Sequence, residues 1–304
     1  MVWQTARYRI DLSRPRVMGI VNVTPDSFSD GGRHASAQAA VAHCLRLVAE
    51  GADLLDIGGE STRPGAVGPG DEIELARVLP VLREAVALGL PVSVDTSSPR
   101  VMAEALALGV DIVNDVRALR RPGALDCLAA HPSAGVCLMH MKGEPDAMQA
   151  EAMYADVVTE VGDFLRQRAL AVQAAGVGRD RIVIDPGIGF AKTADHNIAL
   201  LTRQPELAAL GWPLLVGWSR KGTVGRITGR PIEQRLAGSV AAALLAVERG
   251  ASIVRVHDVA ATVDALKVWQ AIQAHAMQGR TISHSAADMA GPGAGRESRR
   301  GRRR

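Results

Sequence analysis

The stretch of residues 17–32, "VMGIVNVTPDSFSDGG", decides the fold class of this chain. It begins as a nearly continuous apolar run, which predicts a buried strand. At Asn22 it passes into a polar, glycine-ended loop around Phe28. A doubly wound open sheet normally carries a G-x-G-x-x-G turn after its first strand, whereas this strand leads into "NVTPDSF". The stretch therefore favours a barrel, and its long polar loop indicates a functional role.

Seven more short apolar runs follow, and amphipathic or Ala-rich stretches of helical period lie between them. Such nearly continuous apolar strands are typical of a parallel sheet that is covered on both faces. Eight strand–helix units match a single (β/α)8 TIM barrel of the α/β class, with long loops at the carboxyl ends of its strands. The runs read "VMGIVNV", "ADLLDIGG", "PVSVDT", "DIVNDV", "GVCLMH", "IVIDPG", "PLLVGWS" and "SIVRVHDV".

Charge is distributed unevenly along the 304 residues. Residues 279–304 contain seven Arg and two acidic residues, so the rest of the chain is slightly acidic within a total of +3. This segment has no apolar periodicity, and we expect a disordered basic tail. The predicted organisation is an N-terminal segment 1–15, a barrel 16–278 and a tail 279–304.

The chain shows no sign of an oxidising compartment or of a membrane. Its three cysteines, Cys44, Cys127 and Cys137, are odd in number and form no C-x-x-C motif. The N-terminus lacks the apolar core of a signal peptide, and the longest apolar helical stretch is too short to span a bilayer. We expect a cytoplasmic protein with no nucleic-acid or membrane partner.

Polar side chains stand at the end of nearly every predicted strand. In a TIM barrel the active site lies at the carboxyl ends of the strands. One such residue would be explained as a helix cap, but eight strand ends together indicate a site. The residues are Asn22, Asp56, Ser61, Thr62, Arg63, Asp95, Asn114, Asp115, His140, Asp185, Ser219, Arg220, Lys221, Arg255, His257 and Asp258.

The strand ends offer groups for two kinds of ligand. A carboxylate suits the guanidine-like edge of a flat heterocycle, and acids and an amide end the third, fourth and sixth strands. Basic side chains follow the seventh and eighth strands, where barrels often bind phosphate, and Asn22 could give one neutral oxygen to a phosphate-held Mg²⁺. The alternatives stay open: Asp95 and Asp185 as helix caps or turn residues, and Arg255 paired with Asp258 or another surface carboxylate.

The ordered motifs closely resemble those of the dihydropteroate synthase family, the pterin-binding TIM barrels of folate biosynthesis, from about Arg16 to Trp269. They read "GIVNVTPDSFSDGG", "DIGGESTRPG", "VSVDTSSPRV", "LMHMKGEPDAMQ", "DPGIGFAK", "GWSRKGTVG" and "VRVHDV". The resemblance implies a Mg²⁺-dependent transferase that condenses (7,8-dihydropterin-6-yl)methyl diphosphate with 4-aminobenzoate and releases pyrophosphate. It also implies a homodimer, and an enzyme in which sulfonamides compete with aminobenzoate.

The resemblance also implies the role of each site residue. Asp95, Asn114, Asp185 and Lys221 would hold the pterin; Thr62, Arg255 and His257 the diphosphate; and Asn22 the Mg²⁺. The aminobenzoate pocket would be formed by Phe28, Ser61, Arg63, Pro64, Phe190, Ser219 and Lys221. The catalytic set would be Lys221, Asp95, Asp185, Arg255 and His257.

Two other functions compete with this one. A methyltetrahydrofolate-type methyltransferase on the same barrel would keep the Asp95, Asn114 and Asp185 cluster, but it would have no use for the aminobenzoate loops or for "SRK". A non-catalytic pterin-binding paralogue would need none of the intact loops. The chain departs from the usual family motif at Lys142, Ala191, Trp218 and Gly222.

Overall fold

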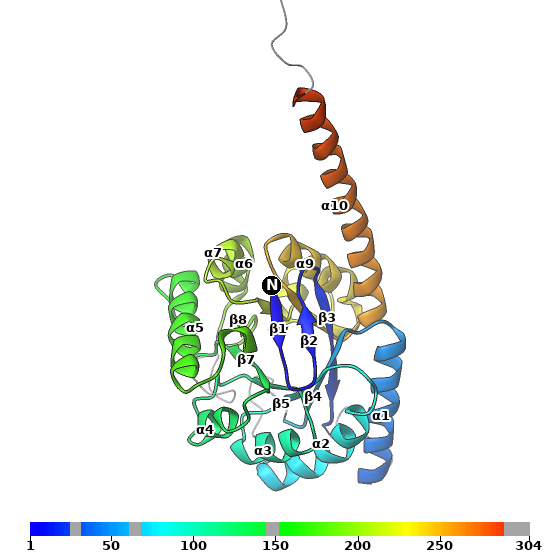
Figure 1. Cartoon of the computed structure of the whole chain (residues 1–304). Helices are drawn as coiled ribbons and strands as arrows, with labels where there is room; N and C mark the ends of the chain where they lie inside the picture. Colours follow the sequence, from blue (N-terminus) through cyan, green and yellow to red (C-terminus); the bar gives the residue numbers. More distant parts are fainter. Residues whose placement is uncertain (25–31, 61–67, 144–151, 289–304) are drawn as a thin grey trace, which may run out of the picture. The chain divides into compact units, whose positions relative to one another are not determined.

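Eight parallel strands form the centre of the computed structural model, which describes residues 1–24, 32–60, 68–143 and 152–288 (Figure 1). Their spatial order is β8-β7-β6-β5-β4-β3-β10-β9. A parallel bridge between Ile184 and Leu214 joins the two ends of this sheet, and the Ile184 N–H donates to the carbonyl of Pro213 at 3.0 Å. The predicted (β/α)8 barrel is thereby confirmed. The strands are β3 Arg16–Asn22, β4 Leu54–Gly58, β5 Val92–Asp95, β6 Ile112–Asp115, β7 Gly135–Met139, β8 Ile182–Asp185, β9 Leu215–Val216 and β10 Ile253–Val256.

Helices surround the barrel, and three of them begin at side-chain caps (Figure 1). Ser98 caps α3, Asp156 caps α5 and Thr193 caps α6, each by accepting backbone N–H groups of the first turn. The acids at the ends of β5 and β8 are therefore not the caps of the next helices. The helical elements are α1 Gly32–Ala49, α2 Asp71–Ala85, α3 Pro99–Ala107, α4 Ala124–Ala129, α5 Val157–Ala174, η3 Arg179–Arg181, α6 Ala194–Thr202, α7 Gln204–Ala208, α8 Gly222–Thr228, η4 Ile232–Gln234, α9 Leu236–Glu248 and α10 Val259–Asp288.

Every predicted apolar run coincides with one of the barrel strands, but the seventh strand is much shorter than its run. The run "PLLVGWS" yields only the two residues of β9. Pro213 has no N–H to contribute to the ladder, which removes one backbone bond at the start of this run. The four residues that follow, Gly217 to Arg220, form a loop that leads to Lys221.

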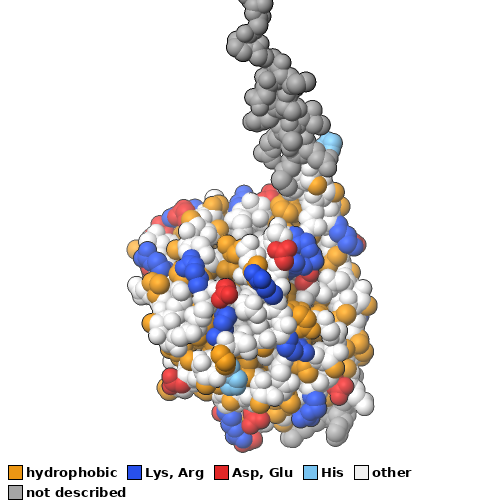
Figure 2. Space-filling model, viewed as in Figure 1, with side chains coloured by type: hydrophobic (Ala, Val, Ile, Leu, Met, Phe, Trp, Pro, Cys, Tyr) orange, Lys and Arg blue, Asp and Glu red, His pale blue; other side chains and the backbone are white. Residues whose placement is uncertain are grey.

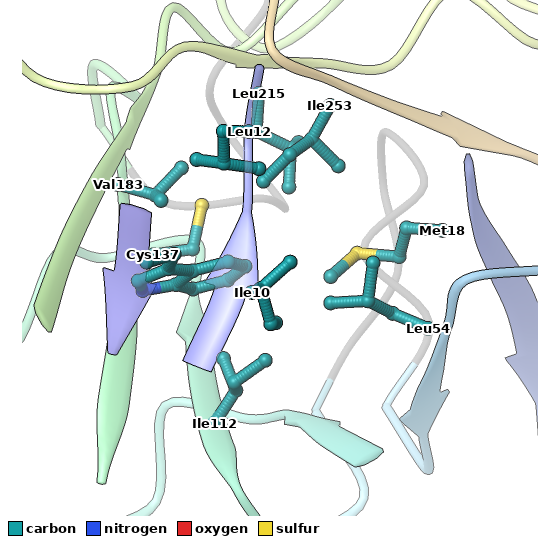
Figure 3. Close-up of a cluster of buried hydrophobic side chains, with 10 residues drawn as sticks. Ile10, Leu12, Met18, Leu54, Ile112, Cys137, Val183, Leu215 and Ile253 are labelled. Atoms are coloured by element: carbon teal, nitrogen blue, oxygen red, sulfur yellow. The ribbon is translucent and has the colours of Figure 1, made fainter. Parts of the chain in front are cut away.

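The first residues form a small hairpin that closes the amino end of the barrel. Strands β1 Val2–Gln4 and β2 Arg9–Asp11 pair antiparallel. Trp3 and Ile10 pack against residues near the starts of the barrel strands, and Figure 3 shows Ile10 among these neighbours. Burying a large apolar side chain stabilises a fold by about 1.5–3 kcal/mol. The cluster consists of Trp3, Ile10, Leu12, Met18, Leu54, Ile112, Cys137, Val183, Leu215 and Ile253.

Two polar features fix this hairpin. The indole N–H of Trp3 donates to the carbonyl of Arg181 at 3.0 Å, and a Cβ at Gly135 would lie 3.0 Å from the indole nitrogen. The guanidinium of Arg7 donates to both carboxylate oxygens of the buried Asp111. These contacts join the N-terminal segment 1–15 to the core of the barrel.

Backbone contacts divide the chain into two units, 1–264 and 265–304. The first contains the hairpin and the barrel. In the second, α10 continues to Asp288, past the predicted start of the tail at 279, because no Pro or Gly follows Gly279 before Gly291. Residues 289–304 lie outside the described residues, so their disorder stays a prediction. Among the described residues, helices long and apolar enough to span a membrane are absent.

Basic and acidic side chains are interspersed over the face of the barrel seen in Figure 2. Exposed ion pairs of this kind, such as Arg166–Asp163 at 2.6 Å, contribute only about 0–1 kcal/mol each. The stability of the barrel therefore comes mainly from its apolar core.

Candidate active site

A cavity of about 1520 Å³ opens at the carboxyl ends of the barrel strands. It lies where the fold places active sites. The predicted site residues that line it are Asn22, Asp95, Asn114, Asp185, Phe190, Ser219, Lys221, Arg255 and His257. Phe28, Ser61, Thr62, Arg63 and Pro64 lie outside the described residues.

Arg255 on β10 links two carboxylates across the mouth of the barrel. Its Nε donates to Oδ2 of Asp56 on β4 at 2.6 Å, and its Nη2 donates to Oδ2 of Asp95 on β5 at 2.8 Å. Asn114 on β6 donates its amide N–H to the same Asp56 oxygen at 3.1 Å. The alternative pairing of Arg255 with Asp258 is therefore wrong. Asp56, which the sequence placed at a strand end without a role, anchors the arginine.

Asp185 is both a turn residue and a wall of the cavity. Its Oδ1 accepts the N–H of Gly187 at 2.7 Å, so the turn that the sequence suggested does exist. The residue also lines the cavity with only 7% of its surface exposed. Burial raises the pKa of Asp185 to about 6, while the Gly187 N–H and Lys221 oppose the rise. At pH 7 the group is mostly a carboxylate with acceptor capacity left for a ligand.

Lys221 lies against Phe190, with its Nζ 4.2 Å from the ring centroid. This cation–π contact joins the loop after β9 to the loop after β8. Burial and nearby Arg255 lower the pKa of Lys221 to about 8, and Asp185 opposes the change. The side chain is therefore mainly an ammonium at pH 7.

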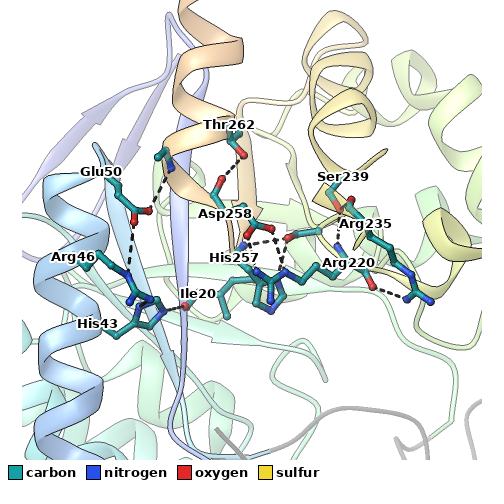
Figure 4. A network of polar contacts seen from close by, with 12 residues as sticks. Ile20, His43, Arg46, Glu50, Arg220, Arg235, Ser239, His257, Asp258 and Thr262 are labelled. Atoms are coloured by element: carbon teal, nitrogen blue, oxygen red, sulfur yellow. Dashed lines mark hydrogen bonds and ion pairs between the residues drawn. The ribbon is translucent and has the colours of Figure 1, made fainter. Parts of the chain in front are cut away.

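The neighbouring Arg220 serves a different purpose. Its backbone has a φ of 59°, in the left-handed region. Its guanidinium pairs with Asp258 at 2.6 Å, as Figure 4 shows. Of two adjacent basic residues, Lys221 contacts the aromatic wall of the cavity and Arg220 is held in an ion pair.

Ser219 fixes the imidazole of His257. The hydroxyl oxygen accepts the backbone N–H of His257 at 3.1 Å and lies 2.9 Å from its Nδ1. Burial, with Arg255 and Arg220 nearby, lowers the pKa of His257 to about 3, so the ring is neutral at pH 7. The Ser219 hydroxyl can pair with Nδ1 in either neutral tautomer. His257 thus supplies a neutral hydrogen-bonding group, not the positive charge that the sequence suggested.

Besides Asp56, two described polar residues at strand ends do not line the cavity. Asp115 accepts hydrogen bonds from Ser97 and from the N–H groups of Arg117 and Leu119, which shapes the loop after β6. His140 accepts a hydrogen bond from Lys192. The sequence indicated no role for Lys192. The one sequence feature that could have pointed to it is its place at the end of the motif "DPGIGFAK".

Comparisons with known proteins agree with this geometry. Residues 18–257 match the family model described as "Pterin binding enzyme". The chain is 54% identical over 277 residues to the dihydropteroate synthase of Neisseria meningitidis serogroup B, covering 89% of this chain and 97% of that protein.

Solved structures give the same result. A dihydropteroate synthase from Xanthomonas albilineans has been solved with 4-aminobenzoic acid (58% identity, TM-score 0.83, 88% of this chain and 96% of that chain). It has also been solved with 7,8-dihydropteroate (54% identity, TM-score 0.83, 90% and 99%). The enzyme of Yersinia pestis has been solved with a sulfonamide drug complex (45% identity, TM-score 0.85, 90% and 100%).

We expect Asp185→Asn to lower the pKa of Lys221 further below about 8, because the lost carboxylate is one of the charges that raise it. The pKa of Lys221 can be measured by following lysine ¹³Cε chemical shifts against pH, since the chain has only four lysines to assign. Asp163→Asn is the control, since Asp163 pairs with the exposed Arg166 on α5. Equal shifts in both variants, or an unchanged Lys221, would contradict the proximity of Lys221 and Asp185.

Proposed function

This chain belongs to the dihydropteroate synthase family of pterin-binding enzymes, and on that premise we propose how its residues carry out the reaction. The reaction joins (7,8-dihydropterin-6-yl)methyl diphosphate to 4-aminobenzoate and yields 7,8-dihydropteroate and pyrophosphate. It is a transferase step of folate biosynthesis, and sulfonamides compete for the aminobenzoate subsite.

One observation carries the assignment of roles: a single cavity joins three sets of groups with different chemistry. Asp95, Asn114 and Asp185 offer acceptors and an amide to a heterocycle edge. Arg255 and His257 offer donors to an anion. The ring of Phe190 under the Lys221 ammonium offers a flat, partly charged wall to a benzoate.

The pterin binds against the acids. A carboxylate accepts two hydrogen bonds from an N–C–N edge, and the free oxygen of Asp185 and the amide of Asn114 provide that recognition. When the carbon–oxygen bond to the diphosphate breaks, positive charge develops on the pterin methylene. Asp95 and Asp185 stabilise it, because fixed charges in a water-poor site need no reorganisation.

The diphosphate binds to the hydrogen-bond donors of the cavity, Arg255 and His257. The electron pair of the broken bond leaves with pyrophosphate, and Arg255 stabilises the negative charge with the guanidinium N–H groups that Asp56 and Asp95 do not occupy. In the tautomer that carries its proton on Nε2, His257 adds a further N–H. Ser219 therefore has two roles. It holds the imidazole that faces the diphosphate, and it forms part of the wall of the aminobenzoate pocket.

The aniline nitrogen of aminobenzoate then forms the new carbon–nitrogen bond and loses a proton. An aniline is neutral at pH 7 and attacks through its lone pair, so the step needs no strong general base. We infer a dissociative order, in which the diphosphate leaves before the nitrogen bonds.

The wild-type protein should release pyrophosphate from the pterin substrate at a rate that rises with 4-aminobenzoate, and dihydropteroate should form in equal amount. A coupled pyrophosphate assay with chromatographic detection of the product measures both. Pterin binding without turnover would instead favour the non-catalytic paralogue. Methyl transfer from a methyltetrahydrofolate would favour the methyltransferase.

Lys221→Ala should lower turnover by at least about tenfold, which is about 1.4 kcal/mol of transition-state stabilisation, with an unchanged melting temperature. The reason is the loss of the ammonium above Phe190 and near the pterin acids. Arg220→Ala is the matched control, because Arg220 pairs with Asp258. Equal losses of turnover in the two variants would show only a general attraction of the anionic substrate to positive charge, and would contradict a specific role of Lys221.

We propose that Mg²⁺ enters the site with the diphosphate. Among the described residues no three His, Cys, Asp or Glu side chains are grouped to hold a metal, but the neutral oxygen of Asn22 lines the cavity at the end of β3. This donor fits an ion whose other ligands are phosphate oxygens and water. When bound, the ion neutralises charge on the leaving group.

Chelating Mg²⁺ should therefore weaken binding of the diphosphate substrate by at least about tenfold, yet leave binding of the bare pterin within about twofold. Isothermal titration with and without EDTA measures both affinities. An equal loss for the bare pterin would place the metal elsewhere.

We further propose a cytoplasmic homodimer. Exposed apolar side chains lie on the consecutive elements α8, η4 and α9, namely Ile227, Ile232, Leu236 and Leu245, and Ile232 and Leu236 also line the cavity. Burial of such a set between two copies would stabilise the pair through the hydrophobic effect. Sedimentation equilibrium that gives the mass of one 32.0 kDa chain would contradict it.

A further inference from the structure

Lys192 is a buried cation surrounded by oxygen and nitrogen acceptors. Only 4% of the residue is exposed. Its ammonium lies 2.9 Å from Nδ1 of His140, 3.0 Å from the carbonyl of Gly187 and 2.9 Å from that of Phe190, with the His140 carbonyl at 3.4 Å. Burying a charge is costly unless hydrogen bonds satisfy it, and here the three N–H groups have four acceptors.

The proton of this pair belongs to Lys192. Burial and Lys192 lower the pKa of His140 to about 2, so the imidazole is neutral and its Nδ1 accepts. Burial lowers the pKa of Lys192 to about 7, and Asp185 opposes the change. The edge of Phe164 packs against the His140 ring at 4.9 Å between centroids, which holds the acceptor in place.

The loop around the ammonium is tightly packed against the end of β7. Gly187 has a φ of 66°, and a Cβ there would lie 2.0 Å from the His140 carbonyl oxygen. The carbonyl oxygens of His140, Gly187 and Phe190 converge on Nζ of Lys192. The N–H groups of Lys192 bind these oxygens and tie the loop after β8 to the end of β7.

The same loop carries one residue of each substrate subsite. Asp185 stands at its start and is bound to the Gly187 N–H, whereas Phe190 stands near its end beneath the Lys221 ammonium. Lys192 holds the carbonyls of Gly187 and Phe190 together. Any change in this clamp moves both subsites.

We propose that Lys192 is a positioning residue that couples the pterin subsite to the aminobenzoate subsite by clamping the Asp185–Phe190 loop. Its ammonium is fully engaged by protein acceptors and acts through Asp185 and Phe190. The identity of the two ligands rests on the proposed function, whereas the clamp itself rests on the geometry.

A double-mutant cycle tests the coupling. Lys192→Met should raise the KM for aminobenzoate at least about fivefold and weaken binding of the bare pterin at least about threefold, because both subsites lose their geometry. In a Phe190→Ala background the same substitution should change the aminobenzoate KM by less than about twofold, because the side chain through which Lys192 acts is gone. A structural role alone would lower the melting temperature and leave the two effects additive.

Lys142→Met is the matched control. Lys142 also follows β7, but its ammonium donates to the carbonyl of Met153 and lies over Tyr154, so it contacts neither Asp185 nor Phe190. Its KM and pterin affinity should stay at the wild-type values. If Lys192→Met does not fold, Lys192→Gln enters the same cycle, since its amide retains two donors for the converging carbonyls.

Additive effects in the cycle, or wild-type affinities for both ligands in a folded Lys192 variant, would overturn the proposal. A wild-type protein that forms no dihydropteroate would instead refute the proposed function. In that case bare pterin binding to the Lys192 and Lys142 variants would still decide whether the clamp positions Asp185.

Discussion

The ion pairs of Arg255 with Asp56 and Asp95 are the interaction on which the site depends. The barrel mouth gathers several carboxylates where little water can solvate them, and burial alone would drive these acids to bind protons. Burial raises the pKa of Asp95, and Arg255 is the main opposing charge. The guanidinium can serve two acids at once because its planar fork presents several donors. One cation from β10 therefore opposes the rise that burial imposes on the pKa of Asp95, and it joins acids from β4 and β5.

The two ends of the barrel have separate tasks. At the amino end, the hairpin residue Trp3 and its apolar neighbours fill the interior, and this packing supplies stability. At the carboxyl end, short strands finish in polar residues, several of which line the cavity. Polar groups can accumulate there because the opposite end stabilises the fold, and a barrel enzyme can bear the cost of several buried charges in its site.

The site contains both a neutral polar side chain, His257, and a charged one, Lys221. His257 is held neutral by burial and by the nearby Arg255 and Arg220, whereas Lys221 keeps an ammonium against Phe190. A neutral imidazole in this place adds a hydrogen-bonding group without adding to the positive charge of Arg255. The loop after β8 connects Lys221, through Phe190, to Asp185, and the tight backbone at Gly187 leaves this loop little freedom. The order of the site therefore comes as much from loop geometry as from the side chains that would touch a ligand.

The sequence by itself determined the eight strand–helix units, the location of the polar strand ends and the family. Each depends on local patterns: apolar runs, their spacing, and motifs such as "DPGIGFAK". It did not determine the partner of Arg255, since Asp56 is 199 positions away and only barrel closure brings the two together. It likewise missed the packing of Trp3 beneath the barrel, the neutral state of His257 and the acceptors around Lys192. Burial and long-range contacts set these properties, and only the tertiary structure decided them, because desolvation acts on the place of a residue in the fold and not on its position in the chain.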